Sequence, residues 1–172
     1  MSNLNIKEQV EKYGFCELYE PDMIELLQLD KYKLLNTEER NRDNGKLDLS
    51  EDLNFAANVA SQYIKNTYVD PYWKDSQFLK YTIWDGVDRD NQGWHTDMFE
   101  EYDIFFLFYN DDTSKETGGA IQFKYKENDV FVEKSFQPKA GSLFCVSNAR
   151  GFWHRAESTS IQRRVASFDF IT

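Results

Sequence analysis

The sequence predicts a mainly β protein (α+β) whose short strands form a jelly roll, supported by helices from the amino-terminal part. Two observations lead to this prediction. Turn-forming residues recur roughly every ten residues through the second half of the chain. The composition is also rich in aromatic residues, with 14 Phe, 10 Tyr and 4 Trp, which suit an interior filled from two sheets. The 172 residues suffice for a single domain, 1–172, with a substantial core.

Residues 1–76 are expected to supply helical and mixed support. Residues 1–20 form a mixed lead-in with a predicted edge strand at 15–19, and Pro21 opens a short helix, since proline costs little in a first turn. The polar segment 36–45 ends in Asn-Gly and is expected to be a loop. Ser50 is a suitable N-cap for a helix that packs an apolar stripe on a sheet. The stripe consists of Leu53, Ala56, Ala57, Ala60, Tyr63 and Ile64.

Residues 77–172 are expected to form the jelly-roll core. The segment 103–110 is apolar on both faces, which is typical of a central strand between two layers. No internal repeat or linker divides the chain. Strands are predicted at 77–84, 103–110, 120–125, 130–136, 142–146, around His154 and at 163–171.

Composition narrows the classes of partner. The net charge of −10 argues against nucleic acid, because binding to phosphates normally needs a basic face. No apolar run approaches the length of a membrane span, and the first residues lack a signal-peptide core. Cys16 and Cys145 lie far apart in sequence and show no metal-type or disulfide spacing. A cytoplasmic protein acting on a peptide, a protein or a small molecule is therefore expected.

The chain's only two histidines belong to one candidate site. His95 and Asp97 lie two positions apart in Gly93–Asp97 (GWHTD), so on a strand their side chains leave the same face. His154 follows on another predicted strand. A His-x-Asp triplet alone is common, and a single histidine is more often a hydrogen-bonded polar residue than a ligand. Two imidazoles and one carboxylate, however, form the facial triad of non-haem Fe(II) oxygenases.

The last predicted strand carries two adjacent arginines. On one face Arg164 stands with Ala166, Phe168 and Phe170, so this otherwise apolar face is expected to line the barrel. A buried guanidinium needs a partner, which is either an Asp or Glu of the chain or a dicarboxylate cosubstrate. Arg163, on the other face, is expected to be solvated.

Several motifs, in this order and spacing, resemble the 2-oxoglutarate and Fe(II)-dependent dioxygenases, and among them the prolyl-4-hydroxylase-like branch. The resemblance extends from about Leu79 to the C-terminus. The motifs are His95-x-Asp97, Gly118-Gly119-x-Ile121-x-Phe123, Pro138-x-x-Gly141-Ser142-Leu143, His154 and an arginine ten positions later.

The resemblance implies a double-stranded β-helix with helices on one sheet. It also implies that His95, Asp97 and His154 bind Fe(II) and that Arg164 binds the distal carboxylate of 2-oxoglutarate. Gly118-Gly119 matches a turn that enters a core strand.

Relatives often place a tyrosine on the strand after His-x-Asp, in contact with the same carboxylate. The alignment puts Phe108 there, so either Tyr109 takes the role through a shift, or Tyr81, Thr82 or Trp84 lines the pocket. Five residues near the ligands in sequence are candidates for the substrate entrance, although packing is the simpler account of each. They are Trp94, Phe99, Tyr102, Arg150 and Trp153.

The activity that the resemblance implies is hydroxylation of an unactivated C–H, with consumption of O2 and 2-oxoglutarate and release of succinate and CO2. Ascorbate is a further reductant that it suggests. A prolyl residue in a peptide or protein is the first expected substrate, and a free amino acid or other small molecule the second. A cupin-like domain would generally need three or four histidines, and nucleic-acid demethylases carry extra arginines near the end. A non-catalytic jelly-roll binding domain remains the alternative from another class.

Overall fold

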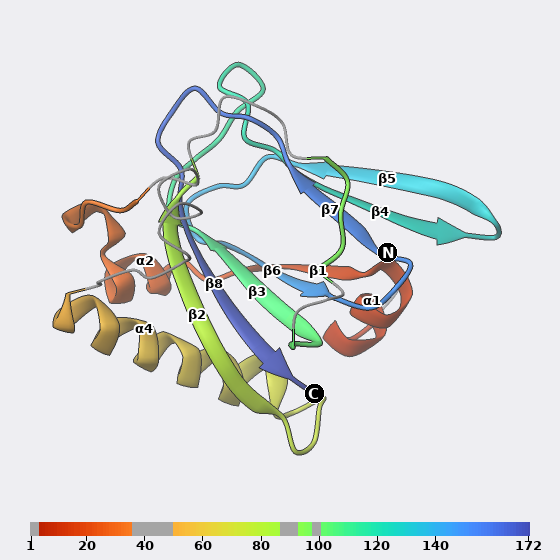
Figure 1. The fold of residues 1–172 in the computed structure, drawn as a ribbon, viewed down its shortest axis with the longest axis horizontal. Coiled ribbons are helices and arrows are strands. Elements are labelled where there is room, and N and C mark those ends of the chain that lie inside the picture. The colour runs from red at the N-terminus through yellow and green to blue at the C-terminus, as the bar shows by residue number, and fades with distance from the viewer. Residues whose placement is uncertain (1–3, 36–49, 87–92, 98–100) are drawn as a thin grey trace.

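The computed structural model describes residues 4–35, 50–86, 93–97 and 101–172. Their strands form two antiparallel sheets, as the jelly-roll prediction requires (Figure 1). The five-stranded sheet has the order β1-β6-β3-β8-β2 and the three-stranded sheet the order β5-β4-β7. The strands of the large sheet are β1 (Phe15–Tyr19), β2 (Gln77–Asp85), β3 (Ile104–Tyr109), β6 (Ser142–Ser147) and β8 (Arg164–Ile171). Those of the small sheet are β4 (Ile121–Glu127), β5 (Val130–Phe136) and β7 (Trp153–Ala156).

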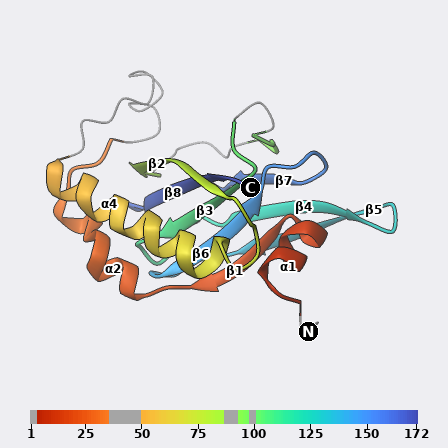
Figure 2. The ribbon, with the colours of Figure 1, turned by 90° about the horizontal axis from the view of Figure 1, so that it is seen from below.

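Helices α2 (Asp22–Leu27) and α4 (Glu51–Ile64) lie on one face of the large sheet (Figure 2). Ser50 caps α4 as predicted, because its Oγ accepts a hydrogen bond from Leu53 N at 3.3 Å. The stripe predicted for this helix is buried over most of its length, although Tyr63 is 40% exposed. A 3₁₀ helix, η1 (Leu29–Lys31), follows α2, and a π-helical segment, η2 (Lys65–Val69), follows α4. No helix within the described ranges is long and apolar enough to cross a membrane. The predicted loop 36–45 lies outside the described residues.

Helix α1 (Ile6–Tyr13) replaces the mixed lead-in expected for the first residues. Asn5 and Glu8 form a reciprocal capping box at its start, and the helix ends at Gly14. The edge strand β1 then follows as predicted, paired with β6. In this pair Cys16 lies directly opposite Cys145, so two thiols distant in sequence are neighbours in the fold, and both are buried and free.

The large sheet has a core on each face. One core lies against the helices and includes Ala166, Phe168 and Phe170 of β8. The other lies between the two sheets and includes Val165 of β8 together with Phe123 of β4. The expectation that the Ala166–Phe168–Phe170 face lines the barrel is therefore wrong. That face is the more apolar one because it packs against α2, α4 and the segments η1 and η2 that follow them, whereas the opposite face also carries polar groups.

Candidate metal centre

Two distant segments meet at the histidines. His95 and His154 form an antiparallel bridge in which His95 N donates to His154 O at 3.1 Å and His154 N donates to His95 O at 3.0 Å. Residues directly opposite each other in an antiparallel pair send their side chains to the same face. His154 is buried on the inner side of β7, and its ring centroid lies 4.4 Å from that of His95.

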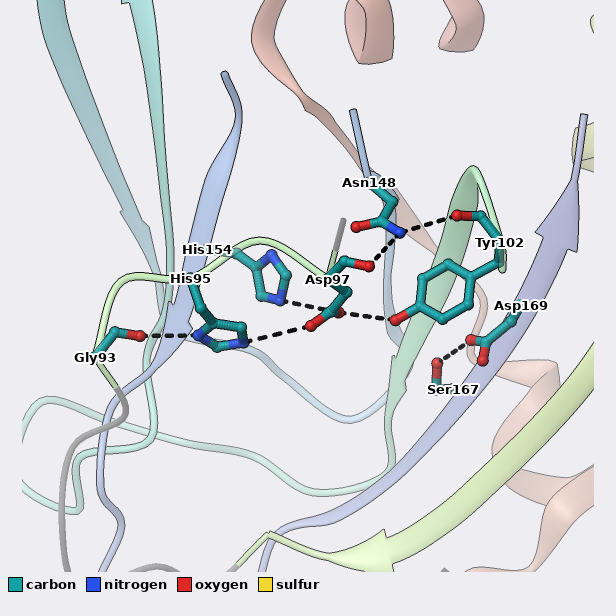
Figure 3. Close-up of polar contacts among 8 residues, drawn as sticks. All are labelled: Gly93, His95, Asp97, Tyr102, Asn148, His154, Ser167 and Asp169. Carbon is teal, nitrogen blue, oxygen red and sulfur yellow. Dashed lines mark hydrogen bonds and ion pairs between the residues drawn. The ribbon is translucent and has the colours of Figure 1, made fainter. Parts of the chain in front are cut away.

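Asp97 completes a cluster whose geometry suits one metal ion. The ligand atoms of His95, Asp97 and His154 all lie within 4.8 Å of one another. His95 Nε2 is 3.9 Å from Asp97 Oδ1, and His154 Nε2 is 3.5 Å from Asp97 Oδ2 (Figure 3). The three side chains predicted as ligands are thus brought together, with the two-imidazole, one-carboxylate donor set that suits Fe(II).

Neighbouring groups orient the ligands, as outer-shell partners do in metal sites. The carbonyl of Gly93 lies 2.8 Å from His95 Nδ1, and since a carbonyl only accepts, the proton belongs on Nδ1 and Nε2 is left as the donor to a metal. Tyr102 donates its hydroxyl to Asp97 Oδ2 at 2.8 Å. Asn148 Nδ2 donates to the carbonyls of Asp97 and Tyr102, at 2.7 and 2.9 Å, which fixes the two residues relative to each other (Figure 3).

The environment of His154 favours its neutral form. Burial lowers the pKa of His154 to about 4, and the neighbouring His95 lowers it as well, while the Asp97 carboxylate acts in the opposite direction. The Phe105 ring packs 5.2 Å from the imidazole and contributes to this dry surrounding. A neutral imidazole is the form that binds a metal, so His154 is prepared as a ligand at neutral pH.

Arg164 is placed differently from the prediction. Its Nε donates to Asp111 Oδ2 at 2.9 Å and its Nη2 pairs with the other oxygen of the same carboxylate. The side chain shares the helix-facing side of β8, where Asp30 of η1 adds further negative charge. Arg164 therefore does not point into the jelly roll, and the protein carboxylate that sequence reasoning left as an alternative is its partner.

Arg163 is the arginine directed inward, and the expectation that it is solvated is wrong, since it is 3% exposed. Its guanidinium donates to the carbonyls of Gly119, Gly86 and Glu157, at 3.0, 3.0 and 3.2 Å. Its Nε is buried without an acceptor. Within the described ranges no carboxylate forms an ion pair with this side chain, and the acceptors of its guanidinium are backbone carbonyls. The Asp85 carboxylate lies near the same residue, since its Oδ1 accepts a hydrogen bond from Arg163 N at 3.2 Å.

Of the other residues proposed for the cosubstrate, Tyr109 lies near enough to Arg163 to feel its charge. Tyr109 belongs to the core between the sheets, whereas Phe108 faces the helices. Burial raises the pKa of Tyr109 to about 12, and the Arg163 charge acts against this shift. Trp84 packs at the edge of the same core. Tyr81 faces α4 instead, because its hydroxyl donates to Asn54 Oδ1 at 2.7 Å.

The residues suggested for the substrate entrance are scattered. Trp94 stacks on the outer face of the small sheet, with Arg155 Cζ 4.4 Å and Lys124 Nζ 5.1 Å from its ring centroid. Trp153 contacts Phe131 on that face, with ring centroids 5.6 Å apart. Arg150 is exposed in the connection between β6 and β7, and Phe99 lies outside the described residues. Among these five only Tyr102 is seen beside the triad, where it holds Asp97.

Sequence reasoning missed three polar residues near the triad. Asn148 gave no signal, because its role depends on contacts with residues 46 and 51 positions away. Ser167 and Asp169 gave a signal, because along β8 they alternate with Ala166, Phe168 and Phe170 of the opposite face. They lie on the face that turned out to line the space between the sheets.

Comparisons with known proteins place the fold. No protein-family model and no curated sequence matches the chain. A prolyl-4-hydroxylase from Pseudomonas putida superposes with a TM-score of 0.64 at 11% identity, with 97% of each chain covered. A prolyl hydroxylase from Trichoplax adhaerens, solved with a peptide fragment of hypoxia-inducible factor, gives 0.67 at 11% identity, covering 96% of this chain and 87% of that one. The α-ketoglutarate-dependent epimerase SnoN of nogalamycin biosynthesis gives 0.68 at 10% identity, covering 96% and 81%.

These similarities show that the chain shares the fold of these prolyl hydroxylases and of this epimerase. The same fold serves hydroxylases and an epimerase, so it does not by itself identify the substrate.

Proposed function

We propose that this protein is a 2-oxoglutarate and Fe(II)-dependent dioxygenase that hydroxylates an unactivated C–H. The observation that carries the proposal is the convergence of His95, Asp97 and His154 on the inner side of a jelly roll. The fold alone is common to many activities, and a His-x-Asp triplet alone is weak. A fixed Nε2 on His95, a tyrosine holding Asp97 and a dry, neutral His154 together describe a site organised for a metal.

Arg163 and Tyr109 are the proposed partners of the distal carboxylate of 2-oxoglutarate. Arg163 is buried, has an Nε without an acceptor and forms no ion pair with an acid among the described residues, so a carboxylate ligand could pair with its charge. A guanidinium can hold a carboxylate with two parallel hydrogen bonds. The nearby Tyr109 hydroxyl, kept protonated by burial, can donate another.

The chemistry balances with O2 as the oxidant. When bound, Fe(II) would activate O2, one oxygen atom entering the succinate formed from 2-oxoglutarate with loss of CO2 and the other becoming the hydroxyl of the product. The residues of the chain bind and orient the reactants. Phe105, Phe123 and Phe144, all buried between the sheets, would exclude water from the site.

Two substrate classes follow from this proposal. A prolyl residue in a peptide is supported by the prolyl hydroxylases among the structural neighbours, one of which is solved with a peptide. A free amino acid is supported by the polar residues Lys80, Ser167 and Asp169 on the inner face of the large sheet.

A spectroscopic test separates the proposed function from a binding role. Anaerobic addition of Fe(II) and then 2-oxoglutarate should produce the weak metal-to-ligand charge-transfer band in the visible. The His154→Ala variant should not produce it, while Tyr19→Phe, which changes a residue that is 62% exposed, should behave like the wild type. A wild-type protein without the band would be a non-catalytic jelly roll.

A further inference from the structure

A polar strip crosses the inner face of the large sheet where β2 and β8 pair. Lys80 lies opposite Asp169, and Thr82 lies opposite Ser167. On the other side of β8, Asp169 is the partner of Phe105 of β3. Directly paired side chains on one face have Cβ atoms about 5 Å apart. Asp169 is therefore a direct neighbour of the phenylalanine that packs on His154.

The two charged residues of this strip, Asp169 and Lys80, differ in their exposure to solvent. Asp169 is 3% exposed, and its Oδ1 accepts a hydrogen bond from Ser167 Oγ at 2.7 Å. Lys80 Nζ lies 4.0 Å from Asp169 Oδ2, which is the outer limit of an ion pair, and the Lys80 side chain is 48% exposed. A buried carboxylate is thus held in place by a hydroxyl, whereas its cationic neighbour Lys80 has access to solvent.

The strip adjoins the metal centre through Tyr102. Lys80 Nζ lies 5.7 Å from the centroid of the Tyr102 ring, and the hydroxyl of that tyrosine donates to Asp97. Figure 3 draws Tyr102 between Asp97 on one side and the Ser167–Asp169 pair on the other. A molecule that places a C–H beside the triad would lie against these residues.

We propose, resting on the function proposed above, that Lys80 and Asp169 select a zwitterionic substrate, a free α-amino acid, by binding its carboxylate and its ammonium group. A carboxylate offers about four acceptor positions, so the Ser167 bond leaves Asp169 able to accept from an ammonium. A zwitterion would form two charge-assisted contacts, one between its carboxylate and Lys80 and one between its ammonium group and Asp169. A prolyl residue within a peptide carries neither charge, so it could not form these two contacts.

The first experiment compares free and blocked substrates in the wild-type protein. Succinate release from 2-oxoglutarate is measured in the presence of each common free amino acid, of its Nα-acetyl amide, and of prolyl peptides. The proposal expects at least one free amino acid to stimulate release about tenfold or more, and the blocked form of that amino acid to stimulate it at least about tenfold less. Equal stimulation by free and blocked forms, or stimulation by prolyl peptides only, would overturn it.

The second experiment tests the two side chains. With the stimulating amino acid, Asp169→Asn and Lys80→Met should each raise its KM at least about tenfold, with a smaller effect on the KM for 2-oxoglutarate. Asp129→Asn and Lys139→Met serve as matched controls, since Asp129 is 96% exposed at the far turn between β4 and β5. An unchanged KM in both test variants would also overturn the proposal.

The charge-transfer band distinguishes a failure of the proposed function from a failure of the substrate assignment alone. Absence of the charge-transfer band in the wild type would remove the proposed function and this inference with it. A band without stimulation by any free amino acid would remove only the substrate inference.

Discussion

Arg163 and Arg164 differ by one position and have opposite environments. Because side chains alternate along a strand, Arg164 meets Asp111 on the helix-facing side of β8, while Arg163 lies between the sheets among carbonyl oxygens. Of the two guanidinium groups, that of Arg164 has an ion-paired carboxylate, whereas that of Arg163 donates to backbone carbonyls.

This difference predicts which arginine binds 2-oxoglutarate. Arg163→Met should raise the KM for 2-oxoglutarate by about tenfold or more, because a charge-assisted pair is lost. Steady-state succinate formation at varied 2-oxoglutarate gives the constant. Arg164→Lys, which keeps a cation opposite Asp111, should change it by less than about threefold. A larger effect at Arg164 than at Arg163 would return the role to Arg164.

Tyr102 makes a second test at this scale. Tyr102→Phe keeps the ring but removes the hydrogen bond to Asp97, so Asp97 should be less well oriented and the apparent affinity for Fe(II) should fall about 10- to 100-fold. The affinity is measured by anaerobic titration of the charge-transfer band at saturating 2-oxoglutarate. The exposed Tyr19→Phe is the control. An unaltered affinity in Tyr102→Phe would mean that Asn148 and the backbone suffice to place Asp97.

At the scale of elements, the strands and α4 were predictable because they depend on local pattern. The two faces of β8 were not, since both are buried along most of the strand and period two cannot then distinguish them. The more apolar face packs on α2 and α4, and the face with Ser167 and Asp169 lines the site. Placing Arg164 in the barrel followed from the assumption that the driest face is the innermost.

Helix α1 shows the opposite case, in which a local signal was present and was not used. Asn5 and Glu8 have the spacing of a capping box, and Gly14 follows one helix length later. Eight residues are few for a stable isolated helix, so its packing against β1 stabilises it.

The turn at Gly118-Gly119, predicted from the resemblance as a backbone feature, has a measurable requirement. Gly118 has φ of +73°, and a Cβ there would lie 2.3 Å from the carbonyl oxygen of Ser158. Gly118→Ala should therefore lower the free energy of unfolding by about 2 kcal/mol or more, from strain in the left-handed region and from the clash. Urea denaturation measures this. At Gly93 an added Cβ meets nothing within 4 Å, so Gly93→Ala should be near neutral, and equal losses in both variants would contradict the explanation.

At the scale of the whole molecule, the site is assembled from parts that no local pattern connects. The triad was predictable because a His-x-Asp motif, a second histidine and a following arginine keep a recognisable order. Asn148 and Arg163 were not, because their roles arise from the packing of the β6–β7 connection and the β8 entry against distant backbone. The sequence therefore indicated the cluster of His95, Asp97 and His154, whereas the residues around it required the fold.

The two thiols provide a global test, because Cys16 and Cys145 pair across β1 and β6 inside the helix-facing core. Burial raises the pKa of Cys16 to about 11 from 9.0 and raises that of Cys145 as well. Between these values the unfolded chain releases protons that the folded chain retains, so the contribution of the thiols to stability is complete below pH 9 and is lost as the pH rises toward 11.

In the presence of a reductant, the free energy of unfolding by urea should fall more steeply from pH 8 to 10 in the wild type than in a Cys16→Ala, Cys145→Ala double variant. Lysines and tyrosines titrate in both proteins, so the difference between the slopes isolates the thiols. Parallel slopes would mean that the thiols ionise in the folded protein, and that the core between β1, β6 and the helices admits water.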